Sequence, residues 1–307
     1  MPPNDAQAAE TETPCRGQNP KTDNAGLRNQ EIEEATNRLF IHRISTALIP
    51  LFIWLRVTPN FVSCLGALSG LAAAFFYYDY ASPLSCVVGF LFMIGWHIFD
   101  GADGQLARRT GQTSALGFVI DGICDYATYT FVYVALAISL SQTLGLGVWI
   151  IVISSGVCHA LQAAAFEMQR EYYIRWTTDA EYERPLDQSI AESESATANV
   201  IARGYRLVQH AFRPLPMALE QRLKEQHLSP DARLGVQENY RTHFKTTVLA
   251  WSFLSANNRT IALFLFCLAG QPLAYFLFEI VVLTLVMLSL IMLNKRSMRS
   301  YEAQLGF

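Results

Sequence analysis

Basic side chains are missing from three long stretches of this 307-residue chain. No Lys or Arg occurs between Val57 and Ala107, between Thr110 and Gln169, or between Thr260 and Asn294. Charged residues make up only 16% of the sequence, while hydrophobic residues make up 51%. Long uncharged apolar runs are typical of a chain that crosses a membrane several times, and they argue against a soluble globular domain.

Several other patterns are absent. The six cysteines form no Cys-x-x-Cys pair, and five of them lie in apolar runs, so we expect neither a disulfide framework nor a zinc site. The N-terminus has no basic segment followed by an apolar core, so we expect no cleavable signal peptide. No period of about 20 to 50 residues repeats along the chain, which excludes a solenoid.

The apolar runs themselves predict an all-α fold, namely a polytopic membrane helix bundle with six transmembrane helices. We place these helices near residues 58–80, 84–108, 113–140, 144–170, 247–270 and 272–294. Thr58 and Pro59 suit the N-cap and the first helical position of the first span. Gly111 suits the end of the second span, and Thr113 or Ser114 suits the N-cap of the third.

The segments outside the spans differ in composition. The N-terminal residues are polar and poor in aromatics, as in disordered chains. Three arginines and Pro50 interrupt the next apolar stretch, which favours an amphipathic helix lying on the membrane over a short spanning helix. We therefore expect a disordered cytosolic tail at 1–35, an interfacial amphipathic helix at 36–57, transmembrane helices 1–4 at 58–170, a cytosolic insert at 171–245, transmembrane helices 5 and 6 at 246–294, and a cytosolic tail at 295–307.

The basic residues predict the orientation in the membrane. Six spans place both termini on one side, together with the hairpin between the second and third spans. The loops expected on the opposite side, near 80–83, 141–146 and 270–272, contain no Lys or Arg. The positive-inside rule therefore predicts a multi-pass protein whose termini and hairpin face the cytoplasm.

Four aspartates stand out at that hairpin, where carboxylates are costly by about 2.5 to 3.5 kcal/mol each at mid-bilayer and therefore indicate function. The pairs are Asp100 with Asp103, and Asp121 with Asp125. Spacings of three and four residues put each pair on one face of a helix. Asp103 lies eight residues before Gly111 and Asp121 eight after Thr113, so both lie about 12 Å from the turn. We expect the four carboxylates to converge in a cavity that opens toward the cytoplasm.

An all-oxygen cluster of this kind suits two Mg²⁺ or Mn²⁺ ions better than zinc. Arg108 can bind phosphate at two points, and two metals with an arginine describe a phosphoryl-transfer site. Asp125, the last along its helix, is the candidate for the general base. Gly117 lies one turn before Asp121 and permits close approach of a ligand or of the other helix. The alternative is a cation transporter or channel, although broken helices and inverted repeats are not evident.

Other polar residues in the apolar runs leave two interpretations open. Arg259 either marks the lower boundary of the fifth span or faces the cavity as a second anion contact. His97 shares a face with Asp100, and we interpret it as a packed or hydrogen-bonded side chain rather than a ligand. His159, Gln162 and Glu167 on the fourth span either line an acceptor site or form hydrogen bonds between helices.

The hairpin resembles the signature of the CDP-alcohol phosphotransferase family, D-x2-D-G-x2-A-R-x8-G-x3-D-x3-D. Every fixed position is filled, by Asp100, Asp103, Gly104, Ala107, Arg108, Gly117, Asp121 and Asp125. The amphipathic entry helix and the Thr58-Pro59-Asn60 start of the first span are also similar to the family. The long insert is not a feature of its minimal members.

The resemblance implies a homodimeric membrane enzyme of phospholipid synthesis that uses two divalent cations. By motif position, Asp100, Asp103 and Asp121 would ligate metal, and Asp125 would be both ligand and base. Gly104, Ala107 and Gly117 would line the cytidine pocket, and Arg108 would hold the phosphates of the donor.

The implied reaction is attack of an acceptor hydroxyl on the phosphate that bears the alcohol, with release of CMP. Either CDP-diacylglycerol donates to a small polar alcohol, or a small CDP-alcohol donates its head group to diacylglycerol or ceramide. Tyr126 stands where members that use strongly anionic acceptors often carry Lys or Arg, so such an acceptor is disfavoured. The expected partners are the CDP-linked donor, the alcohol, the bilayer and a second copy of the chain, and nucleic acid is not among them.

Overall fold

The computed structural model of the chain describes residues 31–178, 212, 221 and 230–304. Every regular element within these ranges is a helix, which confirms the all-α prediction. The helices are η1 (Asn37–Ile41), α1 (His42–Trp54), α2 (Pro59–Tyr78), α3 (Pro83–Thr110), α4 (Ala115–Leu144), α5 (Val148–Thr177), α9 (Pro230–Trp251), η2 (Ser252–Leu254), α10 (Ala256–Leu268), α11 (Pro272–Leu277), η3 (Phe278–Leu283) and α12 (Thr284–Gln304). The predicted tail at 1–35 and insert at 171–245 fall mostly outside the described residues.

Five helices are long and apolar enough to cross a membrane, judged by length and composition. They are Pro59–Tyr78, Pro83–Thr110, Val119–Leu144, Val148–Thr177 and Pro272–Gln304. The chain is thus a multi-pass helix bundle, but the count of six spans is not confirmed. The predicted fifth span at 247–270 is broken at 252–255, and α10 has only 13 residues, fewer than the roughly 20 that a bilayer requires. Asn258 contributes to the break, because its amide donates to the Ser252 carbonyl at 3.0 Å.

Glycine, serine and proline set the helix ends in the way the sequence predicts. Gly111 ends α3 with a φ of 67°, a left-handed conformation that glycine adopts readily. Ser114 caps α4, since its Oγ accepts a hydrogen bond from the Gly117 backbone N–H at 3.0 Å. Pro59 begins α2, although Thr58 before it makes no side-chain cap bond. The short turn between α3 and α4 makes them a hairpin.

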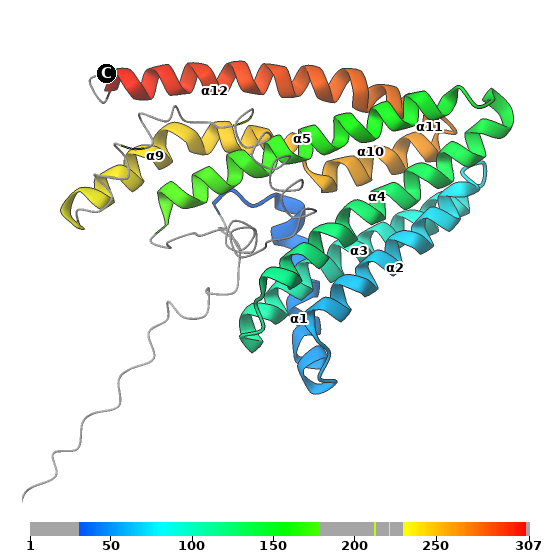
Figure 1. The fold of residues 1–307 in the computed structure, drawn as a ribbon, viewed down its shortest axis with the longest axis horizontal. Helices are drawn as coiled ribbons and strands as arrows, with labels where there is room; N and C mark the ends of the chain where they lie inside the picture. The colour runs from blue at the N-terminus through cyan, green and yellow to red at the C-terminus, as the bar shows by residue number, and fades with distance from the viewer. Residues whose placement is uncertain (1–30, 179–211, 213–220, 222–229, 305–307) are drawn as a thin grey trace, which may run out of the picture.

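Helix α2 packs along both α3 and α4, and small residues make these approaches close (Figure 1). A Cβ on Gly70 would lie 2.5 Å from the Thr128 side chain on α4. A Cβ on Gly95 of α3 would lie 2.8 Å from the Ser69 Oγ. Small residues of this kind are how helices associate in lipid, where no hydrophobic force drives them together. Helix α2 is therefore the element that positions the α3–α4 hairpin.

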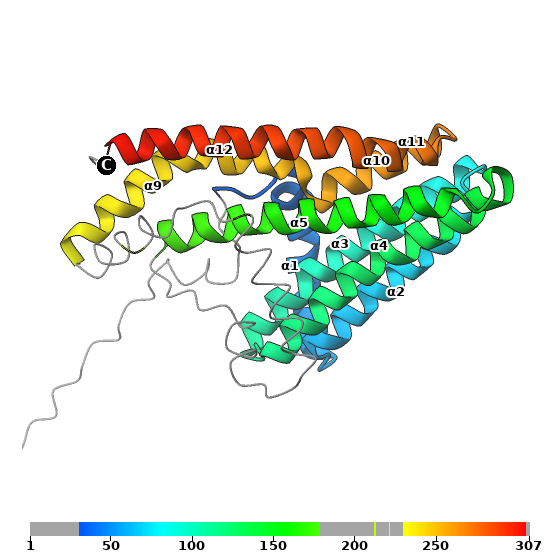
Figure 2. The same ribbon diagram turned by 45° about the horizontal axis from the view of Figure 1, so that its top comes forward.

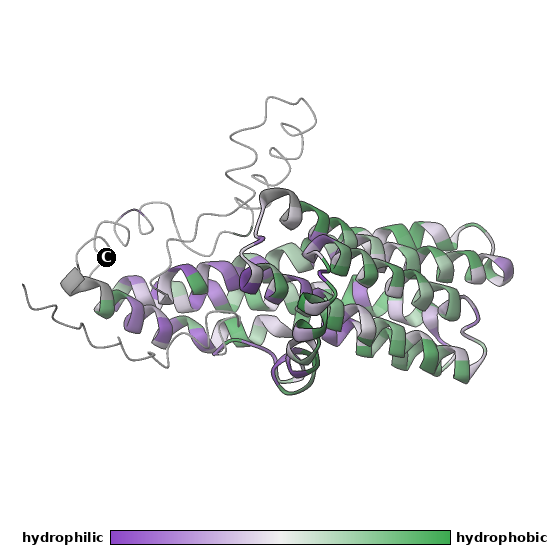
Figure 3. Cartoon of the chain, turned by 90° about the horizontal axis from the view of Figure 1, so that it is seen from below, coloured by the Kyte–Doolittle hydropathy of each residue, from purple (hydrophilic) through white to green (hydrophobic). Residues whose placement is uncertain are grey.

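The helices form two arms that meet near the α4–α5 turn and diverge from it (Figures 1 and 2). Helices α2, α3 and α4 make the first arm, and α5, α9 and α12 the second. Figure 3 shows apolar residues over most of the first arm and more polar residues toward the C-terminal end of the chain. The 33 residues from Pro272 to Gln304 rise about 50 Å, more than a bilayer core of about 30 Å. A straight segment of this length is therefore longer than one crossing of the hydrocarbon requires.

Residues 31–37, here called the N-terminal strap, connect to the second arm. The Glu31 carboxylate accepts hydrogen bonds from the Tyr173 hydroxyl at 3.0 Å and from Arg241 Nε at 3.1 Å. Ile32 is buried in an aromatic cluster that includes Tyr173, and Glu34 accepts from the Asn257 amide at 2.7 Å. The last residues of the predicted tail therefore have side-chain partners far along the sequence.

Helix α1 follows the strap and packs on the first arm. Ser45 Oγ donates to the Ile98 carbonyl of α3 at 2.8 Å, and Ile49 is fully buried. On the other side Leu51 and Trp54 are exposed, Trp54 to 76%. The helix is therefore amphipathic, and its placement on the membrane surface stays a prediction.

A buried ion pair joins α10 to η3. Arg259 Nη1 donates to Glu279, and the two side chains are 1% and 0% exposed. Glu279 also accepts from the Tyr133 hydroxyl of α4 at 2.6 Å, and Arg259 Nη2 donates to Gln162 Oε1 of α5 at 2.7 Å. Arg259 lies in the first turn of α10, consistent with the predicted boundary of the fifth span. Its guanidinium is buried and bonds to side chains of neighbouring helices.

His97 and His159 also make contacts between helices. His97 Nε2 lies 2.9 Å from Thr260 Oγ1 of α10. His159 Nδ1 lies 3.0 Å from the Tyr133 hydroxyl and 3.1 Å from Glu279. These contacts agree with the interpretation that His97 is a hydrogen-bonded side chain, and they favour helix packing for His159.

Candidate active site

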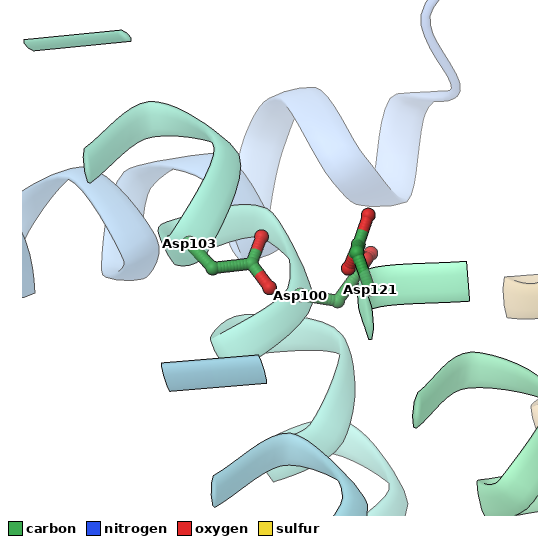
Figure 4. A group of neighbouring side chains, drawn as sticks. All are labelled: Asp100, Asp103 and Asp121. Carbon is green, nitrogen blue, oxygen red and sulfur yellow. The ribbon is translucent and has the colours of Figure 1, made fainter. Parts of the chain in front are cut away.

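The α3–α4 hairpin brings three aspartates from two helices together (Figure 4). Asp100 and Asp103 lie toward the end of α3, and Asp121 lies near the start of α4. One carboxylate oxygen from each lies within 4.8 Å of the other two. The equal distance of the pairs from the turn, as expected from the helical rise, accounts for this convergence.

The three carboxylates fit a hard divalent cation. Asp103 is buried, whereas Asp100 and Asp121 are half-buried, so the group is reachable from one side. Carboxylates this close repel one another, and a bound cation offsets that repulsion. The group consists of oxygen donors alone, which is the set that Mg²⁺ and Mn²⁺ prefer.

Helix α2 contributes a side chain that the sequence did not reveal. Ser63 Oγ donates a hydrogen bond to Asp103 Oδ2, and both residues are buried. The same hydroxyl lies 3.3 Å from the Pro59 carbonyl one turn earlier. Ser63 therefore fixes the orientation of one carboxylate, as outer-shell partners of metal ligands do. It lies 40 residues before Asp103, and no spacing rule connects residues that far apart.

The fourth aspartate, Asp125, is not part of the group of three. Asp125 follows Asp121 by one turn of α4, but the group within 4.8 Å contains only Asp100, Asp103 and Asp121. Asp125 Oδ1 accepts a hydrogen bond from Trp96 Nε1 of α3 at 3.1 Å. Trp96 precedes Asp100 by four residues, so the helical period puts them on one face. The four-residue spacing from Asp100 could have identified Trp96 as a neighbour of the site from the sequence.

The remaining motif residues lie around the aspartates. Arg108 is exposed, and its Nη1 would be 3.3 Å from a Cβ on Gly104, so the guanidinium folds back over that glycine. A Cβ on Gly117 would lie 3.1 Å from Asn60 Oδ1, which means that helix α2 is the close neighbour there. Ala107 is half-buried, and its carbonyl accepts the backbone N–H that caps α3. Their roles in binding a nucleotide stay predictions.

Comparison with known proteins gives one match. The sequence model of the CDP-alcohol phosphatidyltransferase family matches residues 56–187, a segment that contains α2 to α5 and all four motif aspartates. Searches of curated proteins and of solved structures found no match. The matched segment and the aspartate hairpin within it support assignment of the chain to the CDP-alcohol phosphatidyltransferase family.

Proposed function

We propose that the protein transfers a substituted phosphate from a CDP-linked donor to an alcohol, with release of CMP, in the synthesis of a phospholipid. The observation that carries the proposal is the meeting of three motif carboxylates from α3 and α4 within 4.8 Å. A cation transporter would also explain acidic residues in a membrane, but it would not explain a full phosphotransferase motif around them.

Each motif residue has a place in this reaction. Asp100, Asp103, Asp121 and Asp125 are the residues that would hold divalent cations. Two such ions, when bound, would neutralise the diphosphate and stabilise the departing CMP. Arg108 would bind the phosphates of the donor, with Gly104, Ala107 and Gly117 beside the cytidine.

The bond changes assign a task to Asp125. The acceptor oxygen bonds to the phosphorus that carries the alcohol, and the phosphoanhydride bond to the cytidine phosphate breaks. CMP leaves with the bonding electrons, while the proton of the acceptor hydroxyl passes to the Asp125 carboxylate. A neutral amide at that position could not take the proton.

The donor and the acceptor form the finer part of the proposal. We favour CDP-diacylglycerol with a small polar alcohol, and the alternative is a small CDP-alcohol with diacylglycerol or ceramide. Tyr126, which is 55% exposed, follows the last motif aspartate and offers no fixed positive charge for an anionic acceptor. We further propose a homodimer whose site and termini face the cytoplasm.

The test is CMP release by the purified protein with Mg²⁺, using labelled CDP-linked donors and a panel of alcohols. Asp125→Asn is expected to retain binding of the cytidine nucleotide and to lower turnover by about 10²- to 10⁴-fold, the usual contribution of a general base. Asp79→Asn is the matched control, because Asp79 lies in the turn between α2 and α3 and contacts Ser85.

The opposing outcomes are specific. Wild-type turnover in Asp125→Asn would remove Asp125 as the base. Transport of divalent cations into vesicles without CMP release from any donor would favour the transporter. Activity that survives complete removal of divalent cations by EDTA would contradict the metal site.

A further inference from the structure

A hydrogen bond joins Trp96 of α3 to Asp125, the fourth motif aspartate, on α4. Trp96 Nε1 donates to Asp125 Oδ1 at 3.1 Å. The other three motif aspartates already share a cluster that does not include Asp125. The indole thus contacts the carboxylate whose chemistry is proposed to differ from that of its neighbours.

The indole is enclosed between residues of α2 and α4. Trp96 is only 3% exposed. Its ring packs edge-on against Tyr129 of α4 with centroids 5.4 Å apart. A Cβ on Gly66 of α2 would lie 3.4 Å from Trp96 Cδ1. A side chain enclosed in this way presents its N–H in one direction.

The enclosing residues are themselves anchored. The Tyr129 hydroxyl donates to the Ala256 carbonyl at 2.8 Å and lies 3.1 Å from Thr260 Oγ1. His97, whose ring centroid lies 4.3 Å from that of Trp96, bonds to the same threonine. The short helix α10 therefore supports the position of the indole through two side chains.

We propose that Trp96 is a positioning residue that holds one oxygen of Asp125 and leaves the other for the proton of the acceptor. An indole N–H donates but cannot accept, and it carries no charge. It can therefore orient a carboxylate without competing with that carboxylate as a metal ligand. The inference rests on the proposed function, in which Asp125 is the base.

Trp96→Phe tests the inference, because it removes the N–H and keeps an aromatic ring. Loss of one hydrogen bond predicts a fall in kcat of about five- to tenfold. The KM for the CDP-linked donor is expected to stay within about twofold of wild type, because binding of the donor does not depend on this bond in the proposal.

Trp251→Phe is the matched control. Trp251 is fully buried in the second arm, and its Nε1 has no hydrogen-bond partner among the described residues. The substitution therefore makes a similar change in packing without removing a bond. An equal fall in kcat in both variants would overturn the inference, since it would then reflect packing alone.

A second variant covers the case in which Trp96→Phe fails to fold. Benzothienylalanine, placed at position 96 by nonsense suppression, keeps the bicyclic shape and replaces the N–H by sulfur. It is expected to show the same fall in kcat, and wild-type kcat would overturn the inference.

The two proposals can fail separately. If no donor and acceptor give CMP with the wild-type protein, the proposed function fails. If wild type is active and Asp125→Asn is not, but the two Trp96 variants keep wild-type kcat, only the positioning role fails.

Discussion

At the residue scale, the candidate site contains aspartates that lie close in sequence and hydrogen-bond donors that lie far from them in sequence. Asp100, Asp103 and Asp121 could be placed together from sequence, because helical periodicity and a short turn are local properties. The side chains that donate hydrogen bonds to the carboxylates could not be identified from sequence. Ser63 lies 40 residues from Asp103 and Trp96 lies 29 residues from Asp125. Only the packing of the helices brings them into contact.

The Ser63 hydroxyl gives a prediction at this scale. Ser63→Ala removes the donor to Asp103 and is expected to raise the Mg²⁺ concentration for half-maximal CMP release by about tenfold or more, as for other outer-shell partners. A metal titration of the purified variant measures this. Ser69→Ala is the control, since Ser69 donates to the Phe92 carbonyl instead. Equal metal dependence in the two variants would show that the hydroxyl does not act on the site.

At the element scale, helix α2 determines the position of the α3–α4 hairpin. Its small residues let α3 and α4 approach, and its Ser63 reaches Asp103. The sequence predicted the helix and its start at Pro59. The sequence could not predict that α3 and α4 are held together mainly through α2 rather than by direct contact with each other, since that depends on how three helices pack.

The crossing of α2 and α4 supplies the next prediction. Gly70→Ala puts a Cβ 2.5 Å from Thr128 Cγ2, and such overpacking costs about 1 to 3 kcal/mol. The midpoint of thermal unfolding in detergent is expected to fall, and a second change, Thr128→Ala, is expected to restore part of the loss. Gly156→Ala on α5 is the control, since its nearest neighbour, Tyr133 Cδ2, lies at an ordinary 4.0 Å. A Gly70→Ala midpoint equal to that of the control would contradict the close crossing.

At the scale of the whole molecule, a buried polar centre joins the two arms. Glu279 of η3 contacts Tyr133 of α4, Ser155 and His159 of α5, and Arg259 of α10. Sequence reasoning noticed Arg259 as an interruption of an apolar run, but its partner lies in a separate run. Hydropathy does not register a residue's partner, so the sequence could not identify this pair.

The ion pair gives the prediction at this scale. Glu279→Gln leaves the Arg259 charge buried without its carboxylate, and breaking such a pair costs about 3 to 5 kcal/mol. The fraction of protein that stays folded after heating in detergent is expected to fall sharply. Replacing both residues by methionine is expected to be less harmful than Glu279→Gln alone. The reverse order would mean that the charges themselves, rather than their pairing, hold the arms together.

The N-terminal strap and helix α1 together contact both arms of the molecule. Glu31 and Glu34 bind α5, α9 and α10, whereas α1, only a few residues later, is packed on α3. A short segment therefore connects the α3–α4 hairpin to the second arm. The segment that matches the family model begins at residue 56, after the N-terminal strap and α1. The matched segment alone would therefore retain the four aspartates but lose the contacts that Glu31 and Glu34 make with α5, α9 and α10.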